Sequence, residues 1–358
     1  MYQRVAYPLL AQLDAELAHD ITLRLLGRAS RSPLLLGLLR RRLLLTDPRL
    51  HVRLFGCDFP NPLGVAAGLD KNGVAVTALH SLGFGYVEVG TVTPEPQGGN
   101  PQPRMFRLQE DQALINRLGF PGRGTAAVAG QLRRLRGPRP ILGINLGANK
   151  AAVEGGTAVA DYLHGMQTLA SESDYLAINI SSPNTARLRE LQGREALAGL
   201  LQAVIAERDR LSVRRPVLVK IAPDLSPAEL DELLNVVMAH RVDGLIATNT
   251  TLARPTTLRS PHSAQQGGLS GRPLADRSNA VIRTIYRATA GRLPIIGVGG
   301  IFSATDAWHK LRAGASLVQL YTGFVYGGPL TATTINRDLL QRLVAEGVSQ
   351  ITEIVGTL

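Results

Sequence analysis

From residue 64 onward, short apolar runs alternate with longer stretches of mixed polarity. Eight of these runs are apolar at consecutive positions, which is typical of strands buried on both faces. Helical periodicity lies between most of them, for example over residues 196–211 and 227–240. The predicted strands span residues 64–67, 86–91, 141–146, 175–180, 216–221, 244–248, 294–297 and 317–321.

Eight such units predict an α/β protein of the (β/α)8 TIM-barrel class, and an open doubly wound sheet is the alternative. Two observations favour the barrel. The count is eight, and polar or glycine-rich motifs follow nearly every predicted strand, where a barrel places its active site. Residues 53–62 precede the first predicted strand, and we expect them to form a small hairpin that closes the bottom of the barrel.

The first 50 residues have a different pattern, rich in leucine and arginine. Apolar residues recur every three or four positions from Leu9 to Leu25, which predicts one helix that ends near Gly27. A second helix is predicted to begin with Ser32 as N-cap and Pro33 in its first turn. This second helix is apolar on more than one face and carries three consecutive arginines.

A basic helix pair with this much leucine favours a membrane-surface element, and an ordinary helical cap on the core is the alternative. The pattern therefore divides the chain into an N-terminal helical segment, residues 1–46, and a barrel domain, residues 47–358.

Composition narrows the function classes. The chain has 358 residues, 45% of them hydrophobic, which excludes a disordered protein. A single cysteine, Cys57, excludes a disulfide scaffold, and the seven scattered histidines predict no metal site. The net charge of +11 indicates attraction to nucleic acid or to an anionic membrane. Aromatic residues make up only 4% and the arginines are dispersed, so we expect no nucleic-acid partner.

Polar side chains occur where the predicted strands should be apolar. Asn145, Asn179 and Asn249 lie within or directly after strands, which disfavour asparagine. Such amides are either satisfied core groups or the hydrogen-bonding shell of a polar ligand. Lys220 lies inside a run of four apolar residues, and burying its ammonium is costly unless it is paired. It could form a Schiff base or face an electron-rich cofactor.

Glycine-rich turns follow several predicted strands. The motifs at 297–301 and 321–323 follow the last two strands, where barrels bind phosphate through backbone N–H groups. They predict a cofactor that carries a phosphate. Residues 267–271 form another glycine-rich turn, and residues 116–120 form a second candidate turn. Ser182, in Ser-Ser-Pro-Asn-Thr, is either part of a turn or a proton acceptor.

The motifs AAGLDKN, GTVTPEPQGGNPQPRMFRL, INRLGF, INLGANK, NISSPNT, VKIAPD, ATNTT, GGLSG, GVGGI and LYTGF follow one another in this order. Together they resemble the dihydroorotate dehydrogenase family, from about residue 50 to residue 335. The N-terminal helices resemble the class 2, quinone-using branch. Ser182 agrees with class 2, since class 1 members have a cysteine as catalytic base at the matching position.

The resemblance implies FMN at the top of the barrel. The matching positions are Ala67, Gly68, Lys71, Thr91, Asn145, Asn179, Lys220, Thr248, Gly271, Gly300, Tyr321 and Thr322. Of these, the last three would hold the phosphate, and Lys220 would face the N1/C2 edge of the flavin. The positions implied for dihydroorotate are Lys71, Asn116, Arg117, Leu118, Gly119, Phe120, Asn179, Asn184, Asn249 and Thr250.

The implied reaction is the oxidation of dihydroorotate to orotate in pyrimidine biosynthesis. Ser182 would take the C5 proton, with Thr185 as a candidate relay, and hydride would pass from C6 to flavin N5. A membrane quinone would reoxidise the flavin through an apolar tunnel between the two helices, near His19 and Arg107. The resemblance implies a monomer bound peripherally to anionic lipid on the cytoplasmic face of the cell membrane. A class 1 enzyme, a nucleic-acid-binding barrel and a structural membrane-surface protein are the rival interpretations.

Overall fold

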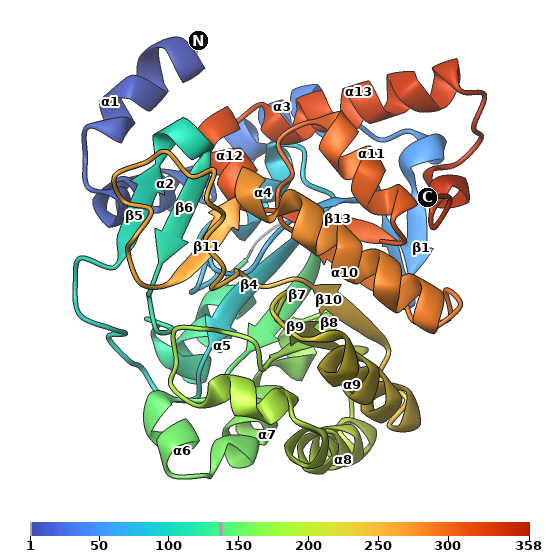
Figure 1. Ribbon diagram of the computed structural model, residues 1–358. Coiled ribbons are helices and arrows are strands. Elements are labelled where there is room, and N and C mark those ends of the chain that lie inside the picture. The colour runs from blue at the N-terminus through green and yellow to red at the C-terminus, as the bar shows by residue number, and fades with distance from the viewer. Residues whose placement is uncertain (1, 136–138) are drawn as a thin grey trace.

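The computed structural model describes residues 2–135 and 139–358. Its centre is a closed barrel of eight parallel strands (Figure 1). The last of these, β13, pairs with the first, β3, and closes the barrel. The strands are β3 (Leu63–Val65), β4 (Tyr86–Val92), β7 (Ile141–Leu146), β8 (Tyr175–Asn179), β9 (Val217–Ile221), β10 (Gly244–Ala247), β12 (Ile295–Val298) and β13 (Leu317–Leu320). All eight predicted strands are confirmed within two residues at each end, and the closure rules out the open sheet.

Helices surround the barrel (Figure 1). They are α4 (Val76–Ser81), α5 (Gly124–Arg133), α6 (Lys150–Glu154), α7 (Ala158–Leu169), α8 (Arg194–Arg210), α9 (Pro227–Ala239), α10 (Ala275–Ala288), α11 (Ala304–Arg312), α12 (Thr322–Gly327) and α13 (Thr331–Ala345). Helix α9 begins with a capping box, in which Ser226 and Glu229 satisfy each other's backbone N–H groups. The helices predicted over 196–211 and 227–240 are therefore confirmed as α8 and α9.

Aromatic side chains fill the lower part of the barrel. A Cβ atom on Gly64 would lie 2.3 Å from the ring of Tyr86, and one on Gly143 would lie 2.1 Å from the ring of Tyr175. These two glycines therefore make room for the two tyrosines. Phe59 packs edge-on against Tyr86, with 5.2 Å between the ring centroids. It belongs to the predicted hairpin, which the structure confirms as β1 (Val52–Leu54) and β2 (Cys57–Phe59).

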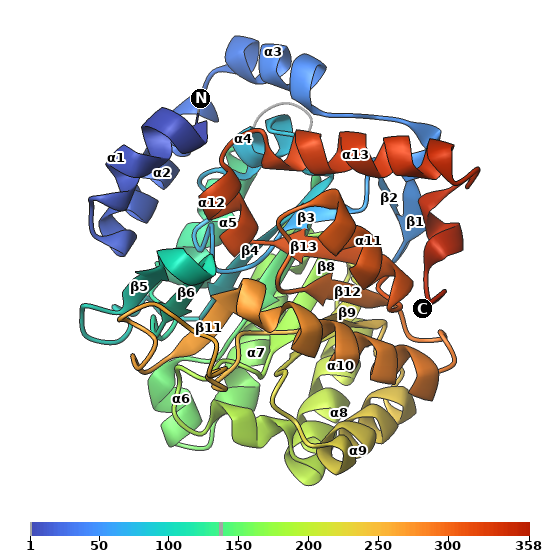
Figure 2. The same cartoon turned by 45° about the horizontal axis from the view of Figure 1, so that its top comes forward.

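The N-terminal segment lies against one side of the barrel as α1 (Tyr7–Ala11), α2 (Ala15–Ala29) and α3 (Pro33–Leu43), after a short π-helix, Tyr2–Ala6 (Figure 2). The single helix predicted through Leu25 is wrong, because the Asp14 carboxylate accepts the N–H groups of Glu16 and Leu17 and starts a new helix. The predicted end near Gly27 is confirmed within two residues, since α2 continues to Ala29. The start of α3 at Pro33, capped by Ser32, is confirmed.

A second, antiparallel sheet was not predicted. It contains β5 (Met105–Leu108), β6 (Ala113–Asn116) and β11 (Gly268–Gly271), in the order β11-β6-β5. The glycine-rich segment predicted as a turn over 267–271 is thus mostly a strand. The N-terminal segment is tied to the loop before this sheet, because Arg104 donates to the Glu16 carboxylate at 2.7 Å and both side chains are largely buried.

Candidate active site

A cavity, which we call the barrel cavity, opens at the carboxyl ends of the strands and holds about 1060 Å³ of unfilled space, its mouth included. Eleven of the twelve predicted cofactor residues line it, namely Ala67, Gly68, Lys71, Thr91, Asn179, Lys220, Thr248, Gly271, Gly300, Tyr321 and Thr322. The twelfth, Asn145, lies one layer lower, where its Oδ1 accepts from Thr91 Oγ1 at 2.6 Å and from Asn179 Nδ2 at 3.1 Å. Asn145 therefore orients two cavity residues from below.

Nine of the ten predicted substrate residues also line the barrel cavity, namely Lys71, Asn116, Leu118, Gly119, Phe120, Asn179, Asn184, Asn249 and Thr250. The tenth, Arg117, points away from it. Its guanidinium donates to Gln265 Oε1 at 3.1 Å and to the Pro103 carbonyl at 2.8 Å, and it lies over the ring of Phe106. The side chain of Arg117 thus fastens two loops together outside the cavity.

Ser182 lies on the loop after β8, where its side chain lines the barrel cavity and is 4% exposed. Its Oγ accepts the backbone N–H of Asn184 at 3.2 Å. Thr185 is buried nearby, but no hydrogen bond joins it to Ser182 within the described ranges. The relay role of Thr185 therefore stays a prediction.

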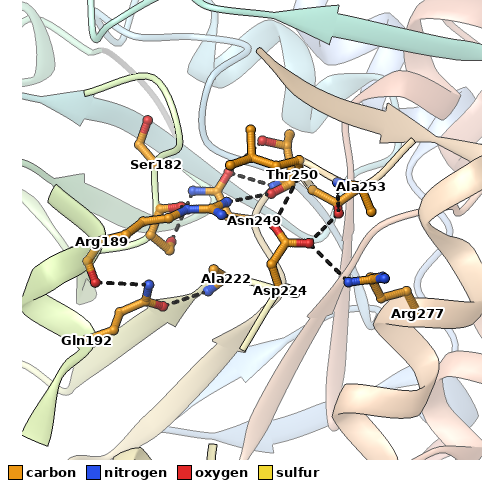
Figure 3. A network of polar contacts seen from close by, with 12 residues as sticks. Ser182, Arg189, Gln192, Ala222, Asp224, Asn249, Thr250, Ala253 and Arg277 are labelled. Carbon is orange, nitrogen blue, oxygen red and sulfur yellow. Dashed lines mark hydrogen bonds and ion pairs between the residues drawn. The ribbon is translucent and has the colours of Figure 1, made fainter. Parts of the chain in front are cut away.

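Arg189 connects the loops that carry the polar cavity residues (Figure 3). Its Nε donates to the Ser181 carbonyl at 3.1 Å, and its two terminal nitrogens donate to Asp224 at 2.9 Å and to the Thr250 carbonyl at 3.0 Å. Asp224 also pairs with Arg277 of α10 at 3.2 Å. One side chain thus holds the loops after β8, β9 and β10 in a single arrangement.

Two lysines, Lys71 and Lys220, line the barrel cavity. Lys71 Nζ donates to the Gly68 carbonyl at 2.7 Å. Burial lowers the pKa of Lys71 to about 8, against the opposing effect of the Glu16 and Asp20 carboxylates, so this amine is mostly protonated at pH 7. Burial also lowers the pKa of Lys220, and the nearby Glu88 carboxylate opposes that effect.

Polar groups in the barrel cavity are available to a ligand. Among the described residues, Asn184 Oδ1 and Thr248 Oγ1 are buried without a hydrogen-bond partner. Such atoms are rare in native structures unless a ligand or water satisfies them. At the far side of the cavity, Gly300 has φ +74°, and a Cβ atom there would lie 2.4 Å from Ala275 at the start of α10. Only glycine therefore fits at this turn, which packs closely against the start of α10 where the sequence predicts a phosphate.

A second cavity, the helix cavity, lies between the N-terminal helices and the barrel. It is lined mainly by apolar side chains, including Leu10, Ala18, Leu25, Leu69 and Phe324, and by both predicted quinone residues, His19 and Arg107. Burial, with a smaller effect of Lys71, lowers the pKa of His19 to about 3, so its imidazole is neutral at pH 7. Arg107 donates to the carbonyls of Ala11 and Leu13 and so caps the end of α1.

Three side chains, Met105, Leu114 and Tyr321, line both cavities and form the wall between them. The rings of His19 and Tyr321 are nearly parallel, with 6.4 Å between their centroids. Met105 and Leu114 were not predicted because they belong to the unpredicted sheet. Arg189 was not predicted either, although its charge, seven residues after Ser182, could have indicated a residue that holds this loop.

The N-terminal segment exposes an unusual amount of apolar surface. Eight of the twelve exposed large hydrophobic side chains of the described chain belong to its first 38 residues, and Leu34 is 89% exposed. Clusters of this kind mark interaction surfaces. Within residues 2–135 and 139–358, no helix is both long and apolar enough to cross a membrane.

Known proteins share this architecture. The family model described as "Dihydroorotate dehydrogenase" matches residues 49–343. A relative from Rhodospirillum rubrum, named "Dihydroorotate dehydrogenase (quinone)", is 48% identical and covers 99% of this chain and 94% of its own length. The mitochondrial protein of that name from Mus musculus is 47% identical over 96% of this chain and 87% of its own. A crystal structure of the Eimeria tenella DHODH in complex with ferulenol superimposes with a TM-score of 0.88 at 38% identity, covering 96% of this chain and 95% of that chain.

The fold and the barrel cavity define a (β/α)8-barrel enzyme whose site lies at the carboxyl ends of the strands. Within that class, the chain belongs to the dihydroorotate dehydrogenase family and is an oxidoreductase. The similarity to the quinone-named relatives extends through the N-terminal helices, which places the chain in the class 2 branch.

Proposed function

We propose that this protein oxidises dihydroorotate to orotate, with FMN as hydride acceptor and a membrane quinone as final electron acceptor, in pyrimidine biosynthesis. The observation that carries the proposal is the pairing of two cavities. A polar cavity holds Ser182, Lys220 and the asparagine amides, and an apolar cavity shares one wall with it. The names of the relatives support the substrate and the acceptor.

The residues of the barrel cavity fit FMN. Gly300, Tyr321 and Thr322 would hold the phosphate, and Ala67 and Gly68 leave room for a planar ring. Lys220 would face the edge of the ring where negative charge develops on reduction, and Thr248 would satisfy its unpartnered hydroxyl. Bound FMN would supply the acceptor for the substrate hydride.

The remaining polar groups would bind and orient dihydroorotate. Lys71 would attract the substrate carboxylate, and the amides of Asn116, Asn184 and Asn249 would hydrogen-bond to its ring. The unpartnered Oδ1 of Asn184 would accept from a ring N–H group. Ser182 would remove the C5 proton as the C6 hydride departs. A serine hydroxyl is a weak base at neutral pH, so its proton must pass onward as it forms, and Thr185 remains the candidate for this relay.

The N-terminal segment, residues 1–46, would attach the enzyme peripherally to the cytoplasmic face of the cell membrane and guide the quinone to the wall beside the barrel domain, residues 47–358. The exposed leucines and nearby arginines support contact with anionic lipid. A neutral His19 and the guanidinium of Arg107 would contact the quinone. We propose that a monomer carries out both half-reactions, because this chain contains both cavities.

The first test is a visible absorption spectrum of the purified protein before and after anaerobic addition of dihydroorotate. We expect a flavin spectrum that bleaches, because the substrate would reduce the bound cofactor. A flavin that stays oxidised would keep the cofactor assignment and reject the substrate. A protein that takes up no flavin even when FMN is added would reject the proposed function as a whole.

Replacing Gly300 with alanine is expected to weaken FMN binding about tenfold or more, because the added Cβ would collide with Ala275 beside the phosphate position. Gly156→Ala is the matched control, since Gly156 has nearly the same φ, +75°, and open space around its Cβ. The dissociation constant for FMN is measured by fluorescence quenching. Equal weakening in both variants would show that the effect is backbone strain and not the loss of the cradle.

Replacing Arg189 with lysine is expected to lower the rate of flavin reduction by dihydroorotate about tenfold, with FMN still bound. The three nitrogens of the guanidinium reach three separate acceptors, which the single nitrogen of a lysine cannot all reach. Stopped-flow absorbance measures this rate. Arg187→Lys is the control, because Arg187 is exposed and its ion pair is with Glu190 on the same loop. If the two variants are equally fast, the loop does not depend on Arg189.

A further inference from the structure

A carboxylate is completely buried inside the barrel below the barrel cavity. Glu88 of β4 has no exposed surface. Its Oε1 accepts from Asn145 Nδ2 at 2.9 Å, and its Oε2 accepts from the Tyr175 hydroxyl at 2.9 Å and from Gln319 Nε2 at 2.8 Å. All three groups donate to Glu88, which suits an ionised carboxylate, since a protonated one would have to donate a hydrogen itself.

The partner of this charge is Lys220, whose Nζ lies 4.0 Å from Glu88 Oε1 and whose side chain is 6% exposed. Lys220 lines the barrel cavity, whereas Glu88 lies beneath it. An ammonium in this setting would lose its proton readily if no negative charge were near. A buried ion pair often contributes no more stability than apolar residues of similar size, so stability alone does not explain this pair.

Glu88 also reaches the cavity by a second route, through Asn145. The bond from Asn145 Nδ2 to Glu88 fixes which end of this amide points down. Its oxygen then points up and accepts from Thr91 and Asn179, two side chains that line the cavity. If the amide turned over, its nitrogen would face the Asn179 nitrogen and its oxygen would face the Glu88 carboxylate, so the bonds to Asn179 and Glu88 would be lost.

We infer that Glu88 is a positioning residue of the active site, which keeps Lys220 charged and in place and fixes the amide of Asn145, and so sets the electrostatics of the floor on which the cofactor ring would lie. This inference rests on the proposed FMN site and adds to it a residue that does not touch the ligand. A merely structural Glu88 would stabilise the barrel without influencing the cofactor.

The first test measures the midpoint potential of FMN bound to Glu88→Gln, by equilibration with redox dyes and dithionite, so that no dihydroorotate is needed. The variant keeps the shape of the side chain and removes its charge. We expect the potential to fall, because an uncharged Lys220 no longer stabilises the reduced flavin. An unchanged potential overturns the inference. A higher potential also overturns it, since that is the effect of removing a negative charge while Lys220 stays charged.

Tyr175→Phe is the matched control for this experiment, because it removes one hydrogen bond to Glu88 and leaves both charges in place. We expect its bound FMN to have a potential closer to that of the wild-type protein than to that of Glu88→Gln. A shift equal to that of Glu88→Gln would assign the effect to packing in the barrel and would overturn the role of the charge.

The second test does not require FMN, so it stays decisive where Glu88→Gln no longer binds the cofactor. Thermal unfolding is compared for Glu88→Gln, Lys220→Met and the double variant, all without cofactor. If the two groups form a charge pair, Lys220→Met leaves the Glu88 carboxylate without its partner, and Glu88→Gln removes the charge that keeps Lys220 protonated. The double variant then melts at a higher temperature than at least one single variant. Losses that simply add in the double variant overturn the pairing. Either result is independent of whether dihydroorotate bleaches the wild-type flavin.

Discussion

Replacing Ser182 with alanine is expected to slow the reduction of bound flavin by dihydroorotate by a factor of about 10² to 10⁴, the usual contribution of a positioned proton acceptor. The hydroxyl of Ser182 lies in the barrel cavity on a loop that Arg189 holds in place, so its removal takes away the proposed base and leaves the surroundings intact. Stopped-flow bleaching of the flavin measures the rate. The FMN content of the variant, read from its oxidised spectrum, should match that of the wild-type protein.

Ser182→Cys is the companion variant, because a cysteine stands at the matching position in class 1 members of the family. We expect it to recover part of the rate that alanine loses, and to recover more as the pH approaches the range where thiols ionise, near pH 8.5. A Ser182→Ala protein that bleaches at the wild-type rate would show that another group takes the proton. In that case the neighbouring amides would still bind the substrate, and the search would move to the loop around Thr185.

The barrel was predictable from the sequence because its strands are buried on both faces. The sequences of β7 and β9, for example, are apolar at nearly every position. Each is followed by a polar motif, as expected at the carboxyl end of a barrel strand, where the active site lies. Lys220 was predicted as a functional residue for the same reason, because it is a charged residue in an apolar run. Glu88, the one charged residue among the seven of β4, was predictable in the same way but was overlooked because it belongs to none of the motifs.

The features that were missed depend on contacts between distant parts of the chain. β11 pairs with β6, which lies more than 150 residues earlier in the chain. Each of the two strands has only four residues, which is too short for an alternating pattern to be recognised. The break before α2 was hidden because the apolar residues keep helical spacing across it, while one carboxylate, Asp14, ends the continuity. Arg117 belongs to the same motif as several cavity residues, but its long side chain extends away from the cavity and donates to Gln265.

The two cavities also explain why a neutral histidine stands beside their common wall. His19 is in the helix cavity, close to the ring of Tyr321 and within the influence of the Lys71 ammonium. A charged imidazole there would be repelled by Lys71 and would lose its hydration, so the neutral form prevails. A neutral ring can donate a hydrogen bond from one nitrogen to a quinone carbonyl without adding a second charge to the cavity that Arg107 already lines.

Filling the helix cavity is expected to separate the two half-reactions. Ala18 of α2 is 7% exposed and lines this cavity, so a tryptophan at position 18 would occupy the space proposed for the quinone. We expect Ala18→Trp to be reduced by dihydroorotate at the wild-type rate, since the barrel cavity is untouched. Reoxidation of the reduced protein by a short-chain ubiquinone should slow at least about tenfold, which corresponds to 1.4 kcal/mol. Double-mixing stopped-flow absorbance measures the two rates separately.

Leu17→Trp is the matched control, because Leu17 is the adjacent residue and its side chain is 47% exposed on the outer face of the same helix. It adds the same ring to α2 without entering the cavity, and we expect both of its half-reactions to match those of the wild-type protein. If Ala18→Trp is reoxidised as fast as Leu17→Trp, quinones do not use the helix cavity and must reach the flavin from another side. If Ala18→Trp is also slow in its reduction by dihydroorotate, the wall of Met105, Leu114 and Tyr321 transmits the change, and the two cavities are not independent.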